Sequence, residues 1–138
     1  MEDFEFYLKK GIVKKSFVDT QRAKKLVKDG ESRMDDVGQL EIHKFPKLIF
    51  ENVYDGIRDF LFAILLQNGY KTNSHEAPIA YLLNLGFDVY TVNKLDNFRY
   101  LRNGSKYYGE EITIEEAKDI KEFYLVINSK LNKILKLL

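Results

Sequence analysis

The residues best suited to chemistry lie in one short segment, between Leu95 and Gly109. This segment combines basic, amide and phenol side chains: Arg99, Arg102, Asn103, Lys106, Tyr107 and Tyr108. Arginine can donate two hydrogen bonds to phosphate oxygens, lysine supplies a point charge, and tyrosine can stack on a base. The segment therefore predicts a site that binds RNA or a nucleotide.

Helical geometry groups most of these side chains on one face. At about 100° per residue, a helix that continues far enough places these residues within one arc: Asp96, Arg99, Asn103, Lys106 and Tyr107. Arg102 lies at the border of the arc. Leu95 and Phe98 precede it by two turns and one turn, so we expect them to hold its stem and leave its guanidinium free to bind an anion. Asp96 is expected to orient the set.

A structural interpretation of the same segment stays open. In this alternative Asp96 pairs with Arg99, and the tyrosines fill the interior of a helical bundle. The two histidines do not predict a metal site. His43 lies in an expected loop with no second ligand in view, and His75, at an expected helix start, has only the Glu76 carboxylate beside it. We therefore expect neither a metal nor another cofactor.

Several short elements of the sequence occur together: Tyr54 with Arg58, Gly69-Tyr70-Lys71, Ser74-His75-Glu76-Ala77, and Arg99 to Asn103 followed by Tyr107-Tyr108-Gly109. In this respect the stretch from about 48 to 135 resembles the HEPN domain, an all-helical nucleotide-binding module. The resemblance implies a homodimer in which paired arginine motifs form an RNA-cleaving cleft without metal. It also implies a minimal nucleotidyltransferase as partner in a toxin–antitoxin system.

The motif departs from the family pattern at its histidine. In the family, an arginine, usually followed by a polar residue, precedes a histidine with four to six residues between the two. Here Arg102 and Asn103 match, but Tyr107 stands in place of the histidine, and no histidine follows His75. Histidine has a pKa of about 6.5 and moves protons at neutral pH far better than tyrosine, whose pKa is about 10. We therefore expect the site to bind rather than to cleave.

The functional prediction is thus a HEPN-type RNA- or nucleotide-binding module with a degenerate Arg-Asn-x3-Tyr motif. One alternative is a metal-independent endoribonuclease in which Arg102 stabilises the transition state and Tyr107 replaces the histidine as acid or base. A second alternative is a non-catalytic structural dimer that recruits a protein partner. Binding requires that Arg102 reach an open groove.

The elements that must position these residues are helical. Apolar residues recur at spacings of three and four, which predicts an all-α fold, an antiparallel bundle of about five helices. The expected helices are Ser16 to Val37, Pro46 to Asn68, His75 to Leu85, Thr91 to Asn103 and Ile114 to Leu137, with a turn or two within residues 2–10. The strand-like stretch Phe87 to Val92 is too short and isolated to make a sheet.

Composition limits the remaining possibilities. The 138 residues predict one domain, with residues 1–45 as an amino-terminal extension of the bundle. The 22 basic and 21 acidic residues give a net charge of +1, so any binding of nucleic acid must rely on a local cluster of basic residues and not on the overall charge. The chain has no cysteine, which fits a reducing compartment.

Apolar patterning bears on membranes and on oligomeric state. The longest apolar run, Phe60 to Leu66, is far shorter than the roughly 20 residues of a membrane helix, and the acidic start is not typical of a secretory signal. We therefore expect a cytoplasmic protein. The apolar stripe of the last helix continues to Leu138, and we expect a second copy of the chain to cover it in a homodimer.

Overall fold

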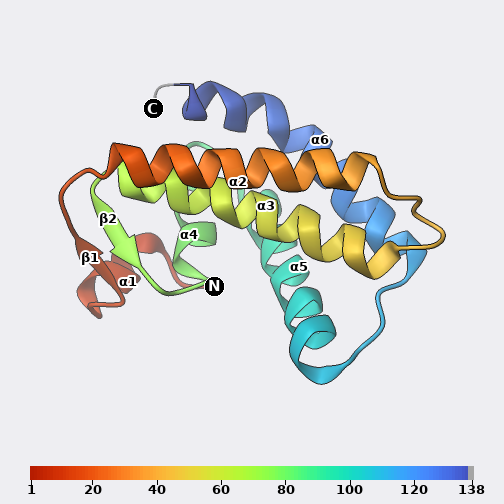
Figure 1. Ribbon diagram of the computed structural model, residues 1–138. Helices are drawn as coiled ribbons and strands as arrows, with labels where there is room; N and C mark the ends of the chain where they lie inside the picture. The colour runs from red at the N-terminus through yellow and green to blue at the C-terminus, as the bar shows by residue number, and fades with distance from the viewer. Residues whose placement is uncertain (137–138) are drawn as a thin grey trace.

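The computed structural model describes residues 1–136, and it is mostly helical (Figure 1). Its elements are, in chain order, α1 (Phe4–Lys9), β1 (Val13–Lys15), α2 (Thr20–Gly38), α3 (Pro46–Gln67), β2 (Tyr70–Thr72), α4 (Ala77–Ala80), α5 (Val89–Tyr108) and α6 (Ile114–Leu135). The predicted all-α bundle is confirmed. No helix within residues 1–136 is both long and apolar enough to cross a membrane.

Helix α3 is the centre of the fold. It packs against α2 along its length and also contacts α5 and α6 (Figure 1). Because it has neighbours on several sides, most of its residues are buried, including Ile49, Phe60 and Ile64. The close packing of α2 on α3 makes the amino-terminal third of the chain part of the bundle.

The helix ends follow the chemistry of their sequence. Pro46 occupies the first turn of α3, and Gly69 follows that helix with a φ of 80°, a left-handed conformation that glycine adopts without strain. Thr113 and Glu116 form the predicted capping box, in which each side chain accepts a hydrogen bond from the other residue's backbone N–H. These signals fixed the first residue of α3 and of α6 correctly.

Four expectations about secondary structure were wrong. The helix expected to start at Ser16 begins only at Thr20, where Asp19 caps it by accepting a hydrogen bond from the Arg22 N–H. The helix expected from His75 to Leu85 is only the four-residue α4, followed by turns up to Gly86. The helix expected from Thr91 to Asn103 is longer at both ends, because Asp88 caps it early by accepting a hydrogen bond from the Thr91 N–H (2.8 Å) and it ends only at Tyr108. A small antiparallel sheet, in which β1 pairs with β2, was not expected at all. Strands of three residues are too short to leave a readable pattern.

The apolar stripe of α6 packs inside its own chain. Ala117, Ile120, Ile127 and Leu131 belong to the main hydrophobic core. They therefore do not form the uncovered surface from which a homodimer was expected. Leu138, with which the predicted stripe ends, and Leu137, the expected last residue of the helix, lie outside the described residues.

Candidate functional site

Helix α5 carries every residue of the predicted site and continues to Tyr108, so the condition for a shared helical face is met. The residues of the predicted site nevertheless differ strongly in burial. The side chains of Arg102 and Arg99 are only 3% and 11% exposed, whereas Tyr107 and Tyr108 are 64% and 79% exposed. The structure thus separates an interior charged half from an exposed aromatic half.

Arg102 is not free to bind an anion, which corrects the sequence-based expectation. Its Nε lies 3.1 Å from Oδ1 of Asp55, and its Nη2 lies 3.0 Å from Oδ1 and 3.3 Å from Oδ2 of the same carboxylate. Leu95 and Phe98 are buried on the same side of α5, as expected, but the guanidinium continues inward instead of outward. Asp55, on α3, faces it there. Arg102 therefore ties α5 to α3 through its Nε and Nη2 donors.

Asp55 belongs to a larger, partly buried network of charges. Nη1 of Arg33, on α2, lies 3.9 Å from Asp55, and Nη1 of Arg58 lies 3.6 Å from it. Arg33 also donates from Nε to the Asp59 carboxylate at 3.1 Å. Burial raises the pKa of Asp59, although Arg33 opposes this shift. The network joins three helices through side chains that the sequence does not place together.

The remaining arginine of the motif, Arg99, is also paired. Its Nε lies 2.8 Å from Oδ1 of Asp96, and its Nη1 lies 3.8 Å from Oε1 of Glu76. The other Glu76 oxygen accepts a hydrogen bond from the Tyr7 hydroxyl at 3.3 Å. One half of the structural alternative, the Asp96–Arg99 pair, is therefore confirmed. The other half, tyrosines that fill the interior, is wrong for Tyr107 and Tyr108.

The fold brings a histidine to the arginines although the motif lacks one. His75 lies at the surface, in the turn before α4. Partial burial lowers its pKa from the usual 6.5, and so do the positive charges of Arg58, Arg102 and Arg99, while Asp55 opposes the shift. The sequence alone indicates no functional role for His75. The only signal that points to it is the element Ser74-His75-Glu76-Ala77, one of those in which the chain resembles the HEPN domain.

The exposed half of the motif forms a groove at the end of α5. Its volume is about 480 Å³, within the usual range of ligand pockets. The groove is lined by Tyr100, Leu101, Asn103, Gly104, Tyr107, Tyr108 and Glu110. We call it the tyrosine groove. Sequence reasoning had proposed Asn103, Tyr107 and Tyr108 but missed Tyr100, which is 65% exposed.

Two small residues shape the tyrosine groove. Gly109 ends α5 in the left-handed conformation, with a φ of 67°, and the chain then turns back so that the Glu110 N–H donates to the Gly104 carbonyl at 3.1 Å. A Cβ at position 104 would overlap the Glu110 carboxylate. In Figure 1 this end of α5 projects from the bundle, away from the α2–α3 pair.

Three cations lie close to the rings of the tyrosine groove. The Lys106 Nζ lies 5.9 Å from the centre of the Tyr107 ring, and the Arg102 Cζ lies at the same distance. The Arg99 Cζ lies 4.7 Å from the centre of the Tyr100 ring. These positions favour attraction between each cation and the face of a ring.

No three histidine, aspartate or glutamate side chains within residues 1–136 are grouped so as to hold a metal ion. Comparison of the chain with protein-family models, with curated proteins and with solved structures finds no match. The resemblance to the HEPN domain therefore stays a prediction, based on the residues quoted above.

Proposed function

We propose that this chain is a HEPN-type module that binds RNA or nucleotides in the tyrosine groove, without the direct contact from Arg102 that the sequence-based prediction required. The observation that carries this proposal is the convergence of three exposed phenol rings, Tyr100, Tyr107 and Tyr108, on one groove beside an exposed lysine. A base can stack on an exposed aromatic ring whatever its sequence, and each such contact contributes about 1–3 kcal/mol. The amide of Asn103, which lines the same groove, can donate to or accept from a base edge.

The charges of the site favour stacking over phosphate contact. Arg99 and Arg102 are each paired with a carboxylate, so they offer little uncompensated charge to a phosphate. Lys106 is exposed, but Glu110 lies in the groove with the opposite charge. We therefore expect an affinity that depends only weakly on salt, because few counterions are released on binding.

The central test is replacement of the groove tyrosines. Tyr107→Ala and Tyr108→Ala are each expected to weaken binding of a short fluorescein-labelled single-stranded RNA by about 5- to 150-fold, the equivalent of one lost stacking contact. Fluorescence anisotropy at low salt measures the change. Both side chains are exposed, so the fold should tolerate their removal.

Tyr90→Ala is the matched control. Tyr90 lies on the same helix and is 69% exposed, but it is at the opposite end of α5 and outside the groove. If Tyr90→Ala weakens RNA binding as much as Tyr108→Ala, the groove is not the site. If neither RNA nor a nucleotide binds, the structural alternative, a dimer that recruits a protein, is favoured instead.

A second candidate function, metal-independent RNA cleavage, is favoured by one observation, the position of His75. Its lowered pKa keeps the imidazole neutral at pH 7, in the form that can accept the proton of a 2′-hydroxyl. In this version His75, and not Tyr107, supplies the base.

Cleavage of single-stranded RNA in EDTA tests this second function. His75→Asn is expected to lower the rate by about 10² to 10⁴, whereas His43→Asn, a change in the only other histidine, should leave it unaltered. Because only the neutral imidazole accepts a proton, the rate should rise with pH through a midpoint below 6.5. If Tyr107→Phe abolishes cleavage and His75→Asn does not, the base is Tyr107, as the sequence alternative holds.

The proposal includes further expectations that derive from the sequence. The homodimer and the minimal nucleotidyltransferase partner rest on the HEPN resemblance. Leu125 and Val126 of α6, which are 71% and 80% exposed, are the residues to examine at a dimer surface. A cytoplasmic location is supported by the absence of cysteine from the sequence.

A further inference from the structure

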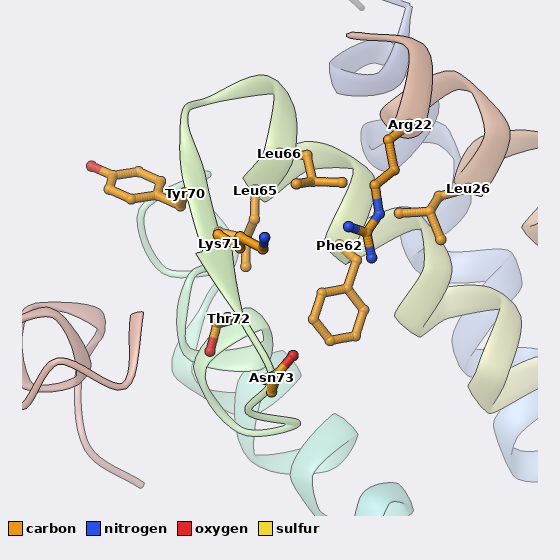
Figure 2. Close-up of a pocket in the computed structure, with 9 residues that line it drawn as sticks. All are labelled: Arg22, Leu26, Phe62, Leu65, Leu66, Tyr70, Lys71, Thr72 and Asn73. Atoms are coloured by element: carbon orange, nitrogen blue, oxygen red, sulfur yellow. The ribbon is translucent and has the colours of Figure 1, made fainter. Parts of the chain in front are cut away.

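A second pocket lies on another part of the molecule, between the start of α2, the end of α3 and β2 (Figure 2). Its volume is about 200 Å³. None of its lining residues belongs to the tyrosine groove or to the charged network around Asp55. We call it the α2–β2 pocket.

The inner wall of the α2–β2 pocket is apolar. Leu66 is buried, Phe62 and Leu26 are half-buried, and all three line the space. A dry cavity of about 150 Å³ with similar walls is large enough for benzene. The pocket can therefore hold one ring, or a short branched chain, together with a small polar group.

The mouth of the pocket carries positive charge. Figure 2 shows Arg22 on the α2 side of the pocket and Lys71 on the β2 side, with the Phe62 ring between and below them in this view. Both residues are exposed, and neither side chain forms an ion pair in the part of the chain that the structure describes. The nearest acid in sequence, Asp19, is engaged as the cap of α2, where it accepts a hydrogen bond from the Arg22 backbone N–H at 3.1 Å.

We propose that the α2–β2 pocket binds a small organic anion, with its carboxylate or phosphate head on Arg22 and Lys71 and its apolar body against Phe62. Arginine can donate two hydrogen bonds to either head group, and lysine adds a point charge. The amide of Asn73, also in the lining, offers a further donor. This function is separate from RNA binding and does not depend on it.

Titration of the full chain followed by ¹H–¹⁵N NMR tests the proposal. Benzoate and phenyl phosphate are the probes, because each joins one ring to one anionic head group. The probe that binds with the higher affinity identifies the head group that the pocket prefers. We expect saturable shifts confined to residues of the pocket, and an affinity at least about 10-fold higher than for acetate, inorganic phosphate or benzyl alcohol, each of which lacks the ring or the charge.

Single-residue variants test whether the probe binds at a specific site or is attracted to positive charge in general. Arg22→Gln and Lys71→Gln should each weaken binding of the tighter probe by about 10-fold, because a charge-assisted hydrogen bond is lost. Lys24→Gln, a neighbouring exposed cation of α2 outside the pocket, should change nothing. Tyr108→Ala should also leave this binding intact, so the result is independent of the RNA proposal.

Three outcomes would overturn the proposal. They are an absence of saturable shifts with both probes at tens of millimolar, equal affinity for inorganic phosphate and phenyl phosphate, and an equal loss in Lys24→Gln and Arg22→Gln.

Discussion

Replacement of Arg102 by methionine is expected to destabilise the fold by about 3–5 kcal/mol, the usual cost of removing one partner from a buried ion pair. Methionine keeps the length of the side chain but removes the donors that hold Asp55, whose side chain is only 12% exposed. Arg58 and Arg33 remain near that carboxylate, but at 3.6 and 3.9 Å they do not replace the two hydrogen bonds that Arg102 donates to it. Urea unfolding followed by circular dichroism measures the change.

Two further variants isolate the cause. Lys106→Met removes an exposed cation from the same helix, and it should alter stability by no more than about 0.5 kcal/mol. Asp55→Asn combined with Arg102→Met removes both charges of the pair, so the double variant should recover part of the loss. If Arg102→Met unfolds at the same urea concentration as the unaltered chain, Arg102 does not brace the fold. It would then again be a candidate for ligand binding.

Replacement of Gly30 by valine is expected to destabilise the fold by about 3 kcal/mol, the upper end of the usual cost of overpacking. Gly30 is buried where α2 crosses α3, and a Cβ at this position would lie 2.5 Å from Cε1 of Phe60 and 2.9 Å from two other ring carbons. The Phe60 ring is 2% exposed, so it has little room to move. Thermal unfolding measures the effect.

Gly38→Val is the control for the loss of a glycine from the same helix. Gly38 is exposed, and a Cβ there would meet nothing within 4 Å. Its replacement should therefore change stability by less than about 0.5 kcal/mol. Phe60→Leu should reduce the cost of Gly30→Val, because a shorter side chain leaves room for the new methyl groups. Equal effects at positions 30 and 38 would show that the close approach of the two helices does not restrict Gly30.

Local signals in the sequence determined most of the helical framework. Pro46 and the capping box of Thr113 and Glu116 each depend on residues within one turn, so their geometry can be derived without knowledge of the rest of the chain. The same holds for the three- and four-residue spacing that predicted an all-α fold. Where the local signals were short, the prediction failed: β1 and β2 were missed, and the helix around α4 was predicted too long.

Only the tertiary structure decided the character of the candidate site. The sequence identified α5 and its Arg-Asn-x3-Tyr motif, but it could not show that Asp55, 47 residues away, faces Arg102 and forms an ion pair with its guanidinium. It likewise could not place His75 near the arginines or bring Tyr100 into one groove with Tyr107 and Tyr108. The direction in which a long charged side chain points depends on the partner that offsets its desolvation, and that partner belongs to another helix.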